Sequence, residues 1–249
     1  MDAGPAARSD AAALVQAQAW VKAAERVMVL TGAGVSAESG VPTFRDALTG
    51  LWARFNPEDM ATEAAYRKHP RMVWDWYQQR RERVLQVQPN PAHLAIADLA
   101  RRKTVTLVTQ NVDGLHQRAG SEGVIELHGN LFANKWLGGC GKCDIATAQT
   151  GRPPRCATCG AMLRPGVVWF GEPLPLVANY RAEEAASSCD VCLVVGTSGL
   201  VYPAAGLPGL AKDHGARVIV VNPEASALDA TADLVIHQPA GTCLPAMLA

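Results

Sequence analysis

Short apolar runs recur along this chain, and longer segments with apolar residues at three- and four-residue steps separate them. The first run, Val27 to Leu30, ends at Thr31-Gly32, which is typical of a buried strand that enters a tight turn. We expect the later runs to be strands as well: 105–109, 124–127, 191–195, 218–221 and 234–236.

The segments between these runs favour helices. Residues 11–25 are rich in alanine with apolar positions on one face, and Pro91 can start a helix because its missing N–H is not needed in the first turn. We expect helices at 11–25, near 57–67, at 70–87, roughly at 91–102 and at 173–188. Strands that alternate with helices indicate an α/β protein, whose parallel sheet is covered on both faces.

Polar clusters directly follow several of the predicted strands. In a parallel sheet these strand ends meet at one edge, where ligands of such sheets bind. The clusters are Gly32-Ala33-Gly34, Gln110-Asn111, His128, Gly196-Thr197-Ser198 and Asn222. Their common position predicts a site more strongly than any one cluster does.

Periodicity is lost over residues 131–168, where glycine, proline and cysteine increase. Two Cys-x-x-Cys pairs in this segment suit tetrahedral zinc, and four thiolates would leave no open position for catalysis. The gap of 12 residues between the pairs is shorter than is usual for a zinc ribbon, and two chance pairs are the alternative. A third pair, Cys189 and Cys192, leads into an apolar run, and we expect it to pack in the core.

The composition and charge of the chain disfavour several classes of protein. The chain has 249 residues, 49% of them hydrophobic, and a formal net charge of zero, which disfavours a general nucleic-acid or membrane-surface binder. No apolar run reaches the roughly 20 residues that a membrane-spanning helix needs. Seven cysteines without a visible secretory leader favour a reducing, cytoplasmic setting, in which paired cysteines are metal ligands.

Gly32 and Gly34 follow a predicted strand, as in turns that let a backbone approach a pyrophosphate. Alone this signal is weak, because glycine turns are common. The acidic residue that usually follows about 20 positions later to hold a ribose is not evident, so a simple hydride-transferring dehydrogenase is disfavoured.

His128 is a candidate general base, because it follows a strand and an imidazole titrates near neutral pH. A lone histidine is more often structural, and we interpret the five others, His69, His93, His116, His214 and His237, as surface or capping residues. Tyr77 and Arg80 share a helix face and could bind a carboxylate together. By composition alone, a buried tyrosine beside a solvated arginine is the simpler interpretation.

Taken together, these motifs resemble those of one family, the sirtuins, which are NAD-dependent protein deacylases. The similarity spans roughly residues 25–245 in the family's order. It rests on Gly32 to Arg45 (GAGVSAESGVPTFR), Thr109 to His116 (TQNVDGLH), His128-Gly129, the two cysteine pairs, Val168 to Glu172 (VWFGE), Gly196-Thr197-Ser198 and Val221 to Glu224 (VNPE).

The resemblance implies a Rossmann-like, doubly wound NAD-binding domain of residues 11–130 and 170–249, with a small zinc domain, 131–169, inserted. The helical part of the small lobe would lie near 45–90. The implied reaction couples removal of an acyl group from lysine to cleavage of NAD, and it yields nicotinamide and an O-acyl-ADP-ribose. Acyl-lysine proteins or peptides would be the partners of a monomeric chain, with no direct nucleic-acid or membrane partner.

The resemblance also implies residue roles. His128 would take a proton from a ribose hydroxyl, and Asn111 would arrange the nicotinamide and its ribose. NAD contacts would come from Gly32, Ala33, Gly34, Ser36, Ala37, Phe44, Arg45, Gln110, Asn111, Val112, Asp113, Gly196, Thr197, Ser198, Asn222, Pro223, Glu224 and Ala240. Substrate contacts would come from Ala61, Tyr77, Arg80, Val168, Phe170, Gly171, Glu172 and Gly199. One structural zinc ion would be held by Cys140, Cys143, Cys156 and Cys159.

This resemblance favours the interpretation that Tyr77 and Arg80 bind a carboxylate. In the sirtuin branch that prefers succinyl- and malonyl-lysine, such a pair binds the acyl carboxylate, and Ala61 would be the small residue that widens the pocket. We therefore expect removal of acidic acyl groups with residual deacetylation. An ADP-ribosyltransferase on the same scaffold and a non-catalytic zinc module are the alternatives.

Two departures from the family pattern concern the insert. The segment 129–139 is longer than family members usually show, and the loop between the cysteine pairs is short. Both predict a rearranged zinc domain.

Overall fold

The computed structural model describes residues 5–42, 60–139 and 142–249, and the side chains of residues 11–42, 60–139 and 142–249 within them. Three expectations lie outside these ranges: the roles of Phe44 and Arg45, and Cys140 as a zinc ligand. None of the helices in the described part is both long enough and apolar enough to cross a bilayer.

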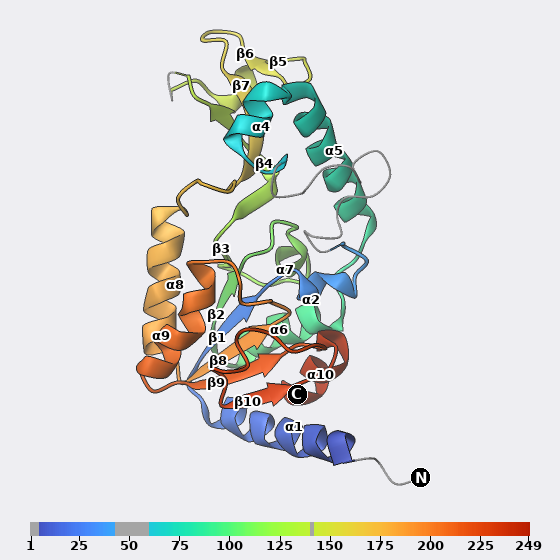
Figure 1. Ribbon diagram of the computed structural model, residues 1–249, viewed down its shortest axis with the longest axis vertical. Helices are drawn as coiled ribbons and strands as arrows, with labels where there is room; N and C mark the ends of the chain where they lie inside the picture. The colour runs from blue at the N-terminus through green and yellow to red at the C-terminus, as the bar shows by residue number, and fades with distance from the viewer. Residues whose placement is uncertain (1–4, 43–59, 140–141) are drawn as a thin grey trace.

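A parallel sheet forms the larger half of the structure (Figure 1). Within the described residues it has six strands in the order β10-β9-β8-β1-β2-β3. In the register, Thr31 lies opposite Thr109 of one neighbour and Val195 of the other, so these strands end at the same level. The bounds are β1 Arg26–Thr31, β2 Thr104–Thr109, β3 Ile125–Glu126, β8 Val191–Val195, β9 Arg217–Val221 and β10 Leu234–Ile236.

Alternate residues of these strands face two separate apolar cores. In β1, Val27 and Val29 join one core, and Met28 and Leu30 join the other. The first core includes residues of α1 (Pro5–Ala23), α6 (Pro91–Arg102) and α10 (Ala240–Met247). The second includes residues of α8 (Leu176–Ser188) and α9 (Leu207–Asp213). Burial on both faces explains why the strands are continuous apolar runs.

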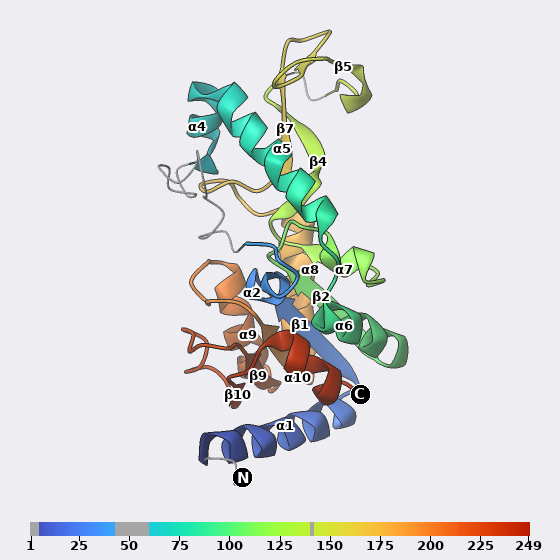
Figure 2. The same cartoon turned by 90° about the vertical axis from the view of Figure 1, so that its right-hand side faces the viewer.

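A third, smaller core lies beyond the carboxyl edge of the parallel sheet, and Figure 2 shows the helices and strands that carry it in side view. Helices α4 (Glu63–Lys68) and α5 (Pro70–Gln86) pack here on an antiparallel sheet with the order β4-β7-β6-β5. Its strands are β4 Gly129–Leu137, β5 Ala148–Gln149, β6 Arg155–Cys156 and β7 Met162–Val167. The remaining elements are short: α2 Gly34–Ala37, α7 Leu115–Arg118, η2 Ile145–Thr147 and η3 Ala204–Gly206.

Several elements match the expected bounds, and the reason is local. The α6 helix begins where the Asn90 side chain accepts a hydrogen bond from the Ala92 N–H, while the Asn90 N–H donates to the Nδ1 of His93. This capping box and Pro91 set the start of the helix at the predicted residue.

Strand β4 and helices α9 and α10 were not predicted from the sequence. Strand β4 pairs with β7 across a bulge between Asn130 and Asn134, and the extra residues break the apolar alternation that would reveal a strand. Gly209 lies inside the short helix α9, and Pro245 lies inside α10. Both residues disfavour a helix interior, so local sequence argues against these two elements.

Candidate active site

A cavity of about 1010 Å³ lies between the carboxyl edge of the parallel sheet and the smaller core. The segments that follow β1, β2, β8 and β9 line one side, which we call the sheet edge. Five residues line the facing side, which we call the α5 wall: Ala61, Tyr77, Arg80, Arg83 and Val84. His128 and residues 167–172 also contribute to the lining.

The glycine turn after β1 packs tightly on the segment that follows β8. A Cβ atom on Gly34 would lie 2.7 Å from the Cα of Gly196, and one on Gly32 would lie 2.8 Å from the Gly196 carbonyl oxygen. The Gly34 N–H donates to that same carbonyl at 2.8 Å. Glycine is therefore required here by the close approach of two backbone segments, in addition to any approach of a ligand.

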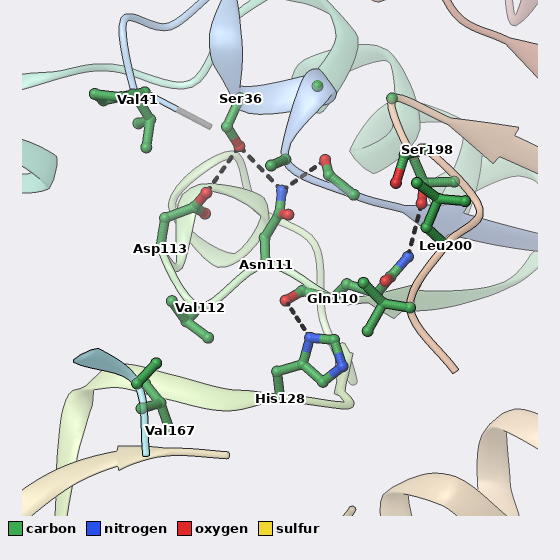
Figure 3. Close-up of a pocket in the computed structure, with 18 of the residues that line it drawn as sticks. Ser36, Val41, Gln110, Asn111, Val112, Asp113, His128, Val167, Ser198 and Leu200 are labelled. Atoms are coloured by element: carbon green, nitrogen blue, oxygen red, sulfur yellow. Dashed lines mark hydrogen bonds between the residues drawn. The ribbon is translucent and has the colours of Figure 1, made fainter. Parts of the chain in front are cut away.

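A buried hydrogen-bond network holds the polar side chains of the sheet edge (Figure 3). The Ser36 hydroxyl donates to Asp113 Oδ2 at 2.8 Å and accepts from Asn111 Nδ2 at 3.1 Å. The same amide nitrogen donates to the Gly32 carbonyl at 3.0 Å. The second carboxylate oxygen of Asp113 accepts from the Leu115 N–H. Asn111 and Asp113 are thus fixed before any ligand binds.

The polar residues that follow β8 and β9 at the sheet edge are fixed in a similar way. Gln110 Nε2 donates to the Thr197 hydroxyl at 3.0 Å, and Asn222 Nδ2 donates to the Thr197 carbonyl at 2.7 Å. Thr197 and Asn222 are buried, whereas Ser198 is exposed at the cavity. Side chains from three strand ends therefore hold one another at the sheet edge.

His128 contributes a neutral imidazole to the cavity. Its Nδ1 lies 3.0 Å from the Gln110 carbonyl oxygen, which can only accept, so Nδ1 carries the proton and Nε2 keeps its lone pair (Figure 3). Burial lowers the pKa of His128 from its usual value, and the bond to Gln110 opposes this only in part. The ring is therefore a neutral proton acceptor at neutral pH.

His116 differs from the expectation that it is a surface or capping residue. Its side chain is 1% exposed, and its Nε2 lies 2.9 Å from the hydroxyl of Thr31, which itself donates to Thr109. The His116 ring contacts that of His93, with centroids 4.7 Å apart and the ring planes tilted by 55°. His93 does cap α6, yet it is also fully buried. The partner Thr31 is 85 positions away, so no local signal reveals this.

The α5 wall brings together the predicted carboxylate-binding pair. Tyr77 is 3% exposed, and the Arg80 guanidinium lies 5.0 Å from the centroid of the Trp76 ring. Burial is the largest influence on the pKa of Arg80 and lowers it. Electrostatic interactions with Tyr77 and, more weakly, with Asp113 raise this pKa but do not cancel the lowering. A desolvated cation at a cavity wall favours an anionic ligand. Arg80 is half-buried, so it is not the solvated arginine of the simpler interpretation.

Three of the four predicted zinc ligands lie together in the described part of the chain. The sulfur atoms of Cys143, Cys156 and Cys159 lie within 4.8 Å of one another, and those of Cys143 and Cys159 are 3.9 Å apart. Tetrahedral zinc with Zn–S bonds of about 2.3 Å separates its sulfur ligands by about 3.8 Å, so the three thiols fit one ion. Cys189 and Cys192 are buried in the core, as expected.

Most other predicted site residues in the described part of the chain line the cavity, with three exceptions there. Ala37, Gly199 and Ala240 are outside its lining. Four further lining residues lie inside quoted motifs but had no predicted role: Gly40, Val41, Pro42 and Trp169. Lining residues outside any motif were missed: Arg83, Val84, Leu131, Val167, Leu174, Tyr202, Ala225, Ser226 and Ala227. Leu200 and Val201 also line the cavity.

A profile of the Sir2 family matches residues 32–203. The chain therefore belongs to the Sir2 family. It is 88% identical over 245 residues, covering 98% of this chain and 100% of the relative, to an NAD-dependent protein deacylase of Ralstonia nicotianae. An NAD-dependent protein deacylase of Pseudomonas aeruginosa is 52% identical, with 90% and 94% covered. A solved Sir2 homologue in complex with NAD superposes with a TM-score of 0.86 at 43% identity, covering 94% of this chain and 92% of that one.

Proposed function

We propose that this chain, an NAD-dependent protein deacylase of the Sir2 family, removes succinyl and malonyl groups from lysine and retains some deacetylase activity. The observation that carries the acyl preference is the composition of the α5 wall. Tyr77, Arg80 and the small residue Ala61 line the same cavity as His128. A phenol and a guanidinium together provide donors suited to a carboxylate.

The sheet edge would bind NAD, with Asn111 and Asp113 at the nicotinamide ribose and Thr197 and Asn222 near the adenosine. NAD supplies an electrophilic ribose carbon when nicotinamide departs. His128 Nε2, whose lone pair is free because Nδ1 donates to Gln110, would then take the proton of a ribose hydroxyl. The acyl-lysine would enter from the side of residues 167–172, with the acyl group against the α5 wall.

The zinc ion would brace the smaller lobe rather than take part in the reaction. Cys143, Cys156 and Cys159 lie outside the lining of the cavity, and thiolate ligands hold structural zinc in closed sites.

The experiment compares one peptide carrying acetyl-, malonyl- or succinyl-lysine, with NAD, in wild type and in Arg80→Met. We expect the variant to lose about 10- to 100-fold of its kcat/KM toward succinyl-lysine, as for one charge-assisted hydrogen bond, and less than threefold toward acetyl-lysine. Arg101→Met is the matched control, because Arg101 is 73% exposed on α6. Equal losses for both acyl groups, or ADP-ribose added to the peptide in place of acyl loss, would refute the proposal.

A further inference from the structure

Trp169 and Tyr77 share a buried hydrogen bond across the smaller core. The indole Nε1 of Trp169 lies 2.9 Å from the Tyr77 hydroxyl oxygen, and the two residues are 1% and 3% exposed. They are 92 positions apart in the sequence, and Tyr77 lines the cavity on the α5 wall.

The direction of this bond is fixed by chemistry. An indole N–H can only donate, so the phenol oxygen of Tyr77 accepts, and the phenol keeps its own proton for another partner. Among the side chains described, those of residues 11–42, 60–139 and 142–249, the Trp169 bond is the one hydrogen bond of this hydroxyl. Burial raises the pKa of Tyr77 to about 12, so the phenol remains protonated at neutral pH. Tyr77 is thereby left as a donor at the cavity, beside Arg80.

Trp169 is itself held from several directions. Its backbone N–H donates to Glu172 Oε2 at 2.9 Å, and the guanidinium carbon of Arg164 lies 3.2 Å from its ring centroid. Arg164 is 2% exposed, pairs with Glu172 and donates to the Val167 carbonyl at 2.8 Å. An ion pair whose arginine is buried therefore holds the indole plane and, through it, the direction of the N–H that meets Tyr77.

We propose that Trp169 is a positioning residue for recognition of acidic acyl groups. Its indole N–H donates to the Tyr77 hydroxyl oxygen and thereby directs the phenol proton to the acyl carboxylate beside Arg80. The proposal rests on the proposed function, since it assigns Trp169 a part in the same acyl site. A neutral acetyl group offers no carboxylate, so the effect is specific to succinyl- and malonyl-lysine.

The test separates the N–H from the shape of the ring. Trp169 is replaced by β-(3-benzothienyl)alanine, in which sulfur takes the place of the indole N–H, and by phenylalanine in a second variant. Each is assayed with acetyl- and succinyl-lysine peptides, alone and together with Tyr77→Phe. Trp74→Phe, another change of a buried tryptophan in the same core, is the packing control.

We expect the benzothienyl variant to raise KM for the succinyl peptide about fivefold, as for one neutral hydrogen bond, with kcat and both constants for the acetyl peptide unchanged within twofold. In the Tyr77→Phe background the replacement should cost nothing further, because no phenol proton remains to be directed. Trp169→Phe should follow the same pattern between the two peptides, even where it lowers the melting temperature.

Equal losses with both peptides, or a succinyl-specific loss that persists without the Tyr77 hydroxyl, would overturn the positioning role and leave Trp169 as a packing residue. Failure of the proposed function gives a different result. In that case wild type itself shows no Arg80-dependent activity toward succinyl-lysine, whatever residue 169 is.

Discussion

The sheet edge and the α5 wall face each other across one cavity, yet they are built by different means. Asn111 and Asp113 at the sheet edge are positioned by the register of parallel strands and by hydrogen bonds to backbone groups and to Ser36. Tyr77 on the α5 wall is positioned by aromatic packing and by a bond to Trp169, which comes from a distant segment. One side thus depends on backbone geometry, which tolerates little change, and the other on side-chain packing, which can be retuned without moving the sheet.

The largest effect should come from the residue at the junction of the two sides. His128→Ala removes the neutral base, and we expect turnover of every acyl peptide to fall about 10²- to 10⁴-fold, the usual range for general-base catalysis. Nicotinamide release and acyl loss measure turnover, and metal analysis should show unchanged zinc. His214→Ala, at an exposed residue of the α9 end, is the control. Near-normal turnover by His128→Ala would show that His128 is not the general base.

The backbone contact of the sheet edge can be broken with one methyl group. Gly34→Ala would place a Cβ 2.7 Å from the Cα of Gly196, and backbone atoms cannot move aside as a flexible side chain can. We expect a loss of about 3 kcal/mol in the free energy of unfolding, the upper part of the range for overpacking. Urea unfolding measures it.

Gly209→Ala is the matched control, because a Cβ at that helical position meets no atom within 4 Å. Equal stability of Gly34→Ala and Gly209→Ala would show that the turn can move aside.

The histidines behind the sheet edge make stability depend on pH. Burial lowers the pKa of His116 to about 3 and that of His93 to about 4, against about 6.5 in an unfolded chain. Between these values the unfolded state binds more protons, so stability falls as pH falls below 6.5. We expect a loss of about 2 kcal/mol per histidine between pH 7 and 5.

Denaturant unfolding at the two pH values tests this, with His116→Gln as the variant. The variant should be less stable at pH 7 but lose less on acidification. The same pH slope in both proteins would mean that His116 does not titrate as described.

A smaller effect concerns the decrease in activity on the acidic side of the pH profile. Because burial lowers the pKa of His128 in the ligand-free protein, the imidazole stays neutral to lower pH, so kcat/KM should begin to fall only below about 6.5, the value for a free imidazole. A profile of kcat/KM from pH 5 to 8, measured at subsaturating peptide and NAD, follows this decrease. Loss of half the activity at or above pH 6.5 would contradict the buried, neutral ring.

The two sides also differ in how far sequence predicts them. Strands β8 and β10 and helix α6 begin and end as expected, because buried apolar runs and the Asn90 cap are local signals. The polar residues of the sheet edge follow from those strand ends. The contact of Trp169 with Tyr77 and the burial of His116 join segments 92 and 85 positions apart, so no spacing rule reveals them. The bulge in β4 hides a strand for a similar reason, since pairing with β7 stabilises it rather than its own pattern.

The most direct measurement follows wild-type enzyme with NAD and a succinyl-lysine peptide by mass spectrometry, and counts nicotinamide, free-lysine peptide and succinyl-ADP-ribose. The account predicts equal amounts of all three in wild type and a selective loss of all three in Arg80→Met, with the acetyl peptide still processed. An intact succinyl peptide alongside rapid deacetylation in wild type would contradict the assignment of the α5 wall.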